Sequence, residues 1–114
     1  MILNKTTNEQ YNIKITYANS FYKRFKGLML KKDFSDGLLF TNLKDSSIHT
    51  LFMRFEIDVY FLDENLLIFE KTTLKPWKFY KPKKQAKYPL ETKKAPSTLS
   101  INNKLKFKEK KEKP

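Results

Sequence analysis

His49 is the only histidine of the chain, and it precedes three charged side chains at alternate positions, Arg54, Glu56 and Asp58. Residues two apart on a strand share one face, so the arginine would lie on the same face as two carboxylates. An imidazole oriented by a carboxylate can perform general acid–base chemistry, which would join His49 with Asp58. The same charged residues could equally form an ordinary ladder of ion pairs. Both interpretations stay open at the level of sequence.

A second group of side chains lies between Lys75 and Tyr88, where cationic and aromatic residues are interleaved. Lysines that contact phosphates and rings that stack on bases are typical of single-stranded nucleic-acid binding. The alternative is that Trp77 and Tyr88 pack into the core while the lysines solvate a loop. The candidate anion-binding residues are Lys75, Lys78, Lys81, Lys83, Lys84 and Lys87.

The positive charge is concentrated in the C-terminal part of the chain. The 114 residues include 24 lysines and arginines against 12 acidic residues, a formal net charge of +12. Residues 1–70 carry nine charges of each sign, whereas residues 71–94 carry nine lysines and one glutamate. A neutral body with a basic C-terminal portion suits nucleic acid or another anionic partner, and a merely solvated surface is the alternative.

Composition excludes several classes of site. With no cysteine, one histidine and two glycines, the chain has no thiolate metal site, no multi-histidine site and no glycine-rich phosphate loop. We therefore expect neither a metal nor a cofactor. The longest apolar runs have four residues, Val59–Leu62 and Leu66–Phe69, so neither a spanning helix nor a signal peptide is expected. A cytoplasmic protein without a membrane partner is the expectation.

Alternation with a period of two predicts strands for most of the chain. Apolar residues at the odd positions predict a strand over 51–62, and residues 66–74 return after a turn as its hairpin partner. Further strands are predicted over 11–17, over 38–43 and, as a final edge strand, around Leu105 and Phe107. Three prolines place residues 75–89 in a loop or at a sheet edge.

One helix is predicted over residues 20–29, where Ser20 can cap it and apolar side chains recur at helical spacing. The elements together predict a mainly β (α+β) fold, a small barrel-like or rolled antiparallel or mixed sheet with this one short helix. Residues 1–108 would form a single β-rich domain. Residues 109–114 would be a frayed basic tail.

Several short strings occur in a characteristic order between Arg24 and about Phe107. They include Gly27-Leu28-Met29, Gly37-Leu38-Leu39-Phe40, Ile48-His49-Thr50, Ile57-Asp58-Val59 and Leu74-Lys75-Pro76-Trp77. In these strings the chain resembles an uncharacterised prokaryotic family, the domain of unknown function 192, in an archaeal-type form. The resemblance implies a compact β-rich domain. The family has no established activity, so it implies no catalytic residue. Its members often have proline where this chain has Glu56, which implies that residues 51–62 form two strands with a break near Phe55.

The leading functional hypothesis is a small, soluble, non-enzymatic binding domain with a pocket or face near Trp77. One alternative is weak, sequence-indifferent binding of RNA or single-stranded DNA through residues 75–88. A second alternative is an enzyme that uses His49, Arg54 and Asp58. The candidate ligand-binding residues are His49, Arg54, Asp58, Trp77 and Tyr88.

Overall fold

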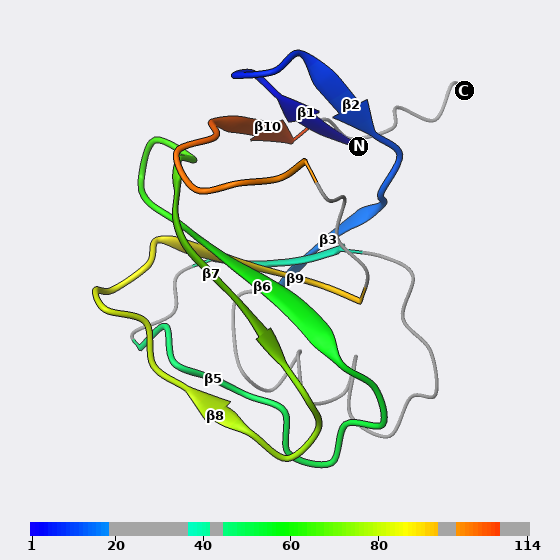
Figure 1. The fold of residues 1–114 in the computed structure, drawn as a ribbon, viewed down its shortest axis with the longest axis vertical. Helices are drawn as coiled ribbons and strands as arrows, with labels where there is room; N and C mark the ends of the chain where they lie inside the picture. Colours follow the sequence, from blue (N-terminus) through cyan, green and yellow to red (C-terminus); the bar gives the residue numbers. More distant parts are fainter. Residues whose placement is uncertain (19–36, 42–44, 94–97, 108–114) are drawn as a thin grey trace.

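The computed structural model describes residues 1–18, 37–41, 45–93 and 98–107, which form ten strands in three sheets (Figure 1). The prediction of a mainly β fold is confirmed. The expectation of a barrel is wrong for the described part, because the largest sheet is open, with β3 at one edge and β7 at the other. The helix predicted over 20–29 and the tail over 109–114 lie outside the described residues.

A mixed sheet of five strands, the central sheet, runs in the order β3-β4-β9-β6-β7. β3 and β4 pair in parallel, and the other neighbours are antiparallel. The predicted hairpin is confirmed as β6 and β7, although its second strand begins at Ile68. The bounds are Ile15–Ala18 for β3, Gly37–Phe40 for β4, Ile57–Leu62 for β6, Ile68–Leu74 for β7 and Tyr88–Thr92 for β9.

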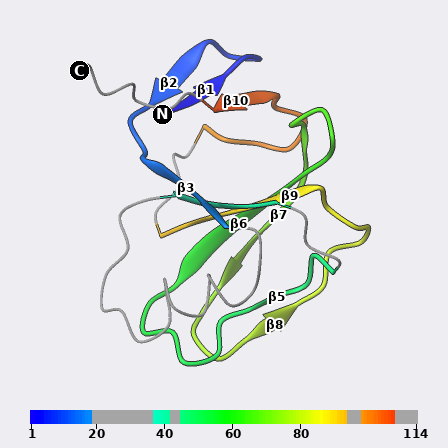
Figure 2. The ribbon, with the colours of Figure 1, turned by 180° about the vertical axis from the view of Figure 1, so that it is seen from behind.

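Two smaller sheets lie on opposite sides of the central sheet (Figures 1 and 2). The N-terminal sheet has the order β10-β1-β2, so the predicted edge strand around Leu105 is confirmed as β10. The outer ribbon consists of the short antiparallel strands β5 and β8. The bounds are Ile2–Asn4 for β1, Glu9–Tyr11 for β2, Ile48–His49 for β5, Phe79–Tyr80 for β8 and Leu105–Phe107 for β10.

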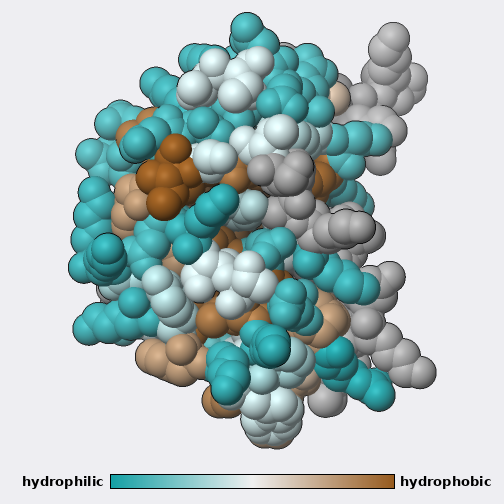
Figure 3. Space-filling model, viewed as in Figure 1, coloured by the Kyte–Doolittle hydropathy of each residue, from teal (hydrophilic) through white to brown (hydrophobic). Residues whose placement is uncertain are grey.

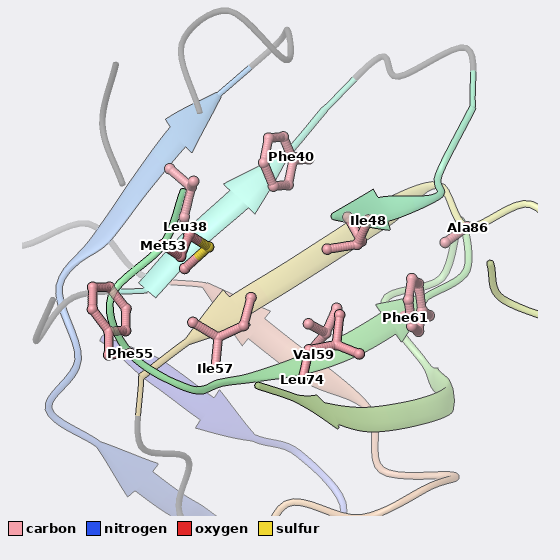
Figure 4. Packing of buried hydrophobic residues seen from close by; sticks show 10 residues of the cluster. All are labelled: Leu38, Phe40, Ile48, Met53, Phe55, Ile57, Val59, Phe61, Leu74 and Ala86. Atoms are coloured by element: carbon pink, nitrogen blue, oxygen red, sulfur yellow. The ribbon is translucent and has the colours of Figure 1, made fainter. Parts of the chain in front are cut away.

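Both faces of the central sheet are apolar. Alternate residues of β6 point to opposite sides, and each side carries apolar residues of this strand. Val59 and Phe61 belong to a cluster that also holds Ile48 of the outer ribbon, as Figure 4 shows. Tyr60 and Leu62 belong to a second cluster. That second cluster includes Ile2, Leu39, Ile68, Leu90 and Leu105, and therefore joins the N-terminal sheet to the central sheet. β6 is consequently buried from both sides.

The strand predicted over 51–62 begins only at Ile57, and turns and bends occupy residues 51–56. Met53 and Phe55 are nevertheless buried and Arg54 is exposed, so burial alternates without a strand. The chain is irregular at Phe55, as the family resemblance implies, but residues 51–56 form no first strand before the break. A loop that follows the surface of an apolar cluster can bury every second side chain as a strand does.

The strand predicted over 11–17 is divided between β2 and β3. The backbone N–H of Ile13 donates to the carbonyl of Tyr11 at 2.9 Å, and the chain passes there from the N-terminal sheet to the central sheet. The strand predicted over 38–43 is β4, which begins at Gly37 and ends at Phe40. A Cβ atom on Gly37 would lie 2.8 Å from Cδ1 of Ile15, so the absence of a side chain lets β3 approach.

Pro89 lies in β9, between β4 and β6, which corrects its placement in a loop or at a sheet edge. It is paired with Phe61 of β6, while the ladder to β4 starts one residue later, at Leu90. Proline is thus tolerated because only one of the two neighbouring ladders extends to its position.

Phenylalanines in the core and on the surface give a matched test of this fold. Phe61 is fully buried and lies 5.8 Å, centroid to centroid, from the stacked ring of Tyr80. We expect Phe61→Ala to lower the free energy of unfolding by about 3–5 kcal/mol, through lost transfer energy and the cavity that remains. Phe79 is 69% exposed, and Phe79→Ala should cost less than about 0.5 kcal/mol. Urea denaturation measures both, and equal losses would contradict these placements.

Candidate functional site

Thr50 holds together two loops, the one that follows β5 and the one between β7 and β8. Its backbone N–H donates to the carbonyl of Lys78 at 2.8 Å, and its carbonyl accepts from the N–H of Trp77 at 2.9 Å. Its hydroxyl donates to the carbonyl of Lys75 at 2.6 Å and accepts from the N–H of Lys78 at 2.8 Å. Thr50 is completely buried. Sequence analysis gave this residue no role, because none of these partners is a neighbour in the chain.

The two loops joined by Thr50 place the rings of Phe52 and Trp77 against each other. The ring centroids are 4.6 Å apart, with an angle of 61° between the planes. Both residues have left-handed backbones, with φ of 62° and 65°. Bulky side chains rarely adopt this conformation, which costs on the order of 1–3 kcal/mol for each residue. The surrounding hydrogen bonds must therefore enforce it.

Phe52, Trp77 and Phe79 form what we call the aromatic patch, with exposed fractions of 47%, 58% and 69%. Leu51 beside them is also exposed. The two loops and the outer ribbon lie at the end of the molecule that is far from the N-terminus (Figures 1 and 2). Figure 3 shows one face of the molecule, which is largely hydrophilic, with apolar colour in separate areas. Large apolar rings gathered on such a surface mark a binding site more often than isolated ones do.

Glu70 fixes which aromatic residue of β8 points inward. Its carboxylate is buried and accepts hydrogen bonds from the hydroxyl of Tyr80 and, at 2.8 Å, from the backbone N–H of Lys83. The bond to Glu70, with burial adding to it, raises the pKa of the Tyr80 phenol. Tyr80 packs on the core, and its strand neighbour Phe79 is left on the surface.

All six lysines that the sequence singled out are exposed, and we call them the lysine track. The side chains of two of these lysines interact with neighbouring groups. Lys84 places Nζ 4.5 Å from the ring centroid of Phe69. The carboxyl of Asp45 has a lowered pKa, chiefly because the backbone N–H of Ser47 donates to it and to a lesser degree because of Lys81. The remaining members of the track are Lys75, Lys78, Lys83 and Lys87.

The other candidate ligand-binding residues lie on separate elements. His49 is half-buried on β5, opposite Phe79 of β8. Tyr88 is half-buried on β9 and packs against the cluster below the N-terminal sheet, so the structure brings Trp77 but not Tyr88 to the aromatic patch. Arg54 is exposed in the loop before β6.

Asp58 lies on β6, where one oxygen accepts from the hydroxyl of its cross-strand partner Thr73 at 2.6 Å. Arg54 and Glu56 precede this strand, so the expected ladder of three charged residues along one strand is not formed. A catalytic site that contains both His49 and Asp58 stays a prediction. In the part of the chain that the structure describes, no three histidine, cysteine or acidic side chains gather to hold a metal ion.

Tyr60 is the neighbour of Asp58 on the same face of β6, and it titrates abnormally. Burial, and then the charge of Asp58, raise the pKa of the Tyr60 phenol to about 12. An unfolded tyrosine ionises near pH 10, so between these values only the unfolded chain loses this proton. The contribution of Tyr60 to stability is thus complete below pH 10 and is lost as the pH rises toward 12.

We therefore expect wild type to lose more stability than Tyr60→Phe between pH 10 and pH 12. The variant lacks only the phenol, and every other side chain is the same in both proteins. Urea midpoints at several pH values in this range measure the difference. Parallel declines of the two proteins would show that Tyr60 ionises normally.

The importance of Thr50 can be tested with Thr50→Val, which keeps the shape and removes the hydroxyl. The carbonyl of Lys75 and the N–H of Lys78 then lose a buried partner, at a cost of about 1–3 kcal/mol. Because the loop holding Trp77 loosens, acrylamide should quench the emission of this single tryptophan more strongly. Thr16→Val, at an exposed position of β3, is the matched control and should change neither quantity.

The sequence matches the DUF192 family, described as an uncharacterized ACR, over residues 2–102, and the chain belongs to this family. The UPF0127 protein of Pyrococcus furiosus is 42% identical over 93 residues, which cover 79% of this chain and 80% of that one. The corresponding protein of Pyrococcus horikoshii is 42% identical over 94 residues, covering 80% and 82%. The one of Thermococcus kodakarensis is 39% identical over 95 residues, covering 80% of this chain but 60% of that one. The archaeal resemblance predicted from sequence is confirmed.

Two crystal structures share the fold. A Sinorhizobium meliloti protein described as a "putative transcription regulator" superposes with a TM-score of 0.78 at 15% identity, over 92% of this chain and 88% of that one. A Novosphingobium aromaticivorans protein of unknown function superposes with a TM-score of 0.69 at 11% identity, over 83% and 75%. At these identities the likeness concerns the fold alone. No helix in the described part of the chain is long and apolar enough to span a bilayer.

Proposed function

We propose that the chain is a binding domain for an anionic partner, which docks on the aromatic patch and on the lysines beside it. The observation that carries the proposal is the pairing of Phe52 with Trp77. Two exposed rings are held edge to face at 4.6 Å on left-handed backbones. Both the backbone conformation and the exposure of the rings oppose folding, so the arrangement points to a role other than stability.

The charge of the same region supports an anionic partner. From Lys71 to Lys94 the only acidic residue is Glu91, and Glu91 is fully buried in β9. The described surface of this segment is therefore cationic around the aromatic patch. Lys78 follows Trp77 directly in the chain and Lys75 lies two residues before it, and both are exposed. Cations around apolar rings raise the encounter rate with a polyanion and add a salt-dependent attraction.

An enzyme that uses His49, Arg54 and Asp58 is the weaker alternative. It would need the three side chains around one reacting atom. Arg54 is exposed in the loop before β6, and Asp58 already accepts a hydrogen bond from Thr73 on the strand that follows in the hairpin. Binding through the aromatic patch needs no such convergence.

The proposal predicts that the affinity for a polyanion depends on the position of the lysines and not only on their number. Heparin serves as a polyanion without bases, and the emission of Trp77 reports its binding. The double variant Lys75→Gln/Lys78→Gln should bind heparin roughly tenfold more weakly than wild type, because two cations beside the site are lost.

The control is Lys104→Gln/Lys106→Gln, which removes two exposed lysines near the N-terminal sheet and lowers the net charge of +12 by the same amount. This variant should stay within about twofold of wild type, because the lost charges are distant from the patch. Equal weakening of the two variants would refute a localised site, as would an emission of Trp77 that heparin leaves unchanged.

A further inference from the structure

We propose that the anionic partner is a single-stranded nucleic acid, bound without sequence preference along a path from the aromatic patch to β9. This inference rests on the proposed function and names the class of partner for the same surface. It combines two observations, the exposed faces of Trp77 and Phe79 and the course of the lysine track. Each argues against a different class of competing partner.

The rings favour unpaired bases. Phe79 is 69% exposed and Trp77 is 58% exposed, so a planar partner can reach both. Bases in a duplex are already stacked on one another and are closed to such rings, whereas unpaired bases stack on any aromatic side chain. A polyanion without bases, such as a sulfated polysaccharide, would use the lysines and gain little from the rings.

The lysines favour a linear partner over a membrane surface. A membrane-binding tip needs its cations in the same plane as its apolar side chains. Here Lys75 and Lys78 lie close to Trp77 in the chain. The rest of the lysine track, which includes Lys83 and Lys87, belongs to the segment that connects β8 with β9, and Figure 1 shows the course of that segment. A flexible strand of phosphates can follow this whole path, while a flat bilayer that meets the loops at the end of the molecule would contact only its beginning.

The choice of cation predicts that binding is indifferent to sequence. Arginine is the residue that reads guanine in a bidentate manner, whereas lysine acts as a point charge on phosphates. The chain has two arginines, Arg24 and Arg54, and neither lies between Lys75 and Lys87. The lysine track therefore gives affinity for the backbone, and the rings add stacking that every base can provide.

The experiment compares four probes: a labelled oligothymidylate, an oligouridylate of equal length, a duplex of that length, and heparin. Anisotropy is the readout for the labelled probes, and the emission of Trp77 for heparin. Wild type should bind both single strands with similar affinity and the duplex at least tenfold more weakly. Four lysines of the track whose ammonium groups have no contact described here (Lys75, Lys78, Lys83 and Lys87) predict a slope of log K against log salt of about −3.

Phe79→Ala is the decisive variant, because it removes a ring, keeps every charge and retains Trp77 as the reporter. It should weaken binding of the oligothymidylate about tenfold, as expected for one lost stacked base, and leave heparin binding within about twofold. Tyr17→Ala, which removes a ring that is 43% exposed on β3, is the control and should change neither. Trp77→Ala, followed by anisotropy, is the second variant and should weaken the oligothymidylate similarly.

Several results would overturn the inference. Equal affinity for the single strand and the duplex, together with no effect of Phe79→Ala or Trp77→Ala, would show that charge alone binds and that no base stacks. Binding to phosphatidylserine vesicles but to neither oligonucleotide would replace the nucleic acid with a membrane, and the proposed binding of an anionic partner would still stand. If heparin, vesicles and oligonucleotides all fail to bind at low salt, the proposed function itself is wrong.

Discussion

The fold depends on one constraint: the central sheet is apolar on both faces, so both faces must be covered. β6 shows the constraint most clearly, because Val59 and Phe61 point to one side and Tyr60 and Leu62 to the other. The N-terminal sheet covers one face, and the outer ribbon with the loop before β6 covers the other. Burial of apolar surface on both sides supplies most of the stabilisation of such a sheet.

The covering elements are short, and a few buried polar groups fix them in place. β5 and β8 have two residues each, too few for a stable ladder of their own. Thr50 joins the loops at one end of this ribbon, and Glu70 holds Tyr80 and the backbone of Lys83 at the other. Because these hydrogen bonds turn Tyr80 inward, they also leave Phe79 on the surface. The hydrogen bonds that hold the outer ribbon over the core therefore also leave the aromatic patch on the surface.

The binding surface that we propose is defined by what the fold leaves outside. Its rings are exposed next to lysines, and the one acidic residue of the segment, Glu91, is buried within the central sheet. Such a surface attracts an anion without the convergent polar groups that catalysis needs. The family has an uncharacterised description, and its relatives in Pyrococcus and Thermococcus carry no assigned activity in their names. The physical character of this surface is therefore the best guide to the partner.

The sequence alone determined the features that depend on neighbouring residues: the β class, the hairpin of β6 and β7, the edge strand β10 and the basic segment with its interleaved rings. Alternation and charge are local properties, so they can be recognised without knowing which strands pair. Only the tertiary structure decided that β9 lies between β4 and β6 despite Pro89, and that residues 51–56 form a loop although their burial alternates.

The site shows the same division. The candidates Trp77 and Lys78 can be recognised from their residue types. Residue type alone does not separate Tyr88 from Trp77, although Tyr88 packs against the cluster that joins the N-terminal sheet to the central sheet. Thr50 was overlooked, because its partners lie more than 20 residues away in the chain and a threonine carries no mark of such contacts. Hydrogen bonds between distant segments form only after the chain has collapsed around both faces of the sheet, and they decide which aromatic rings remain exposed.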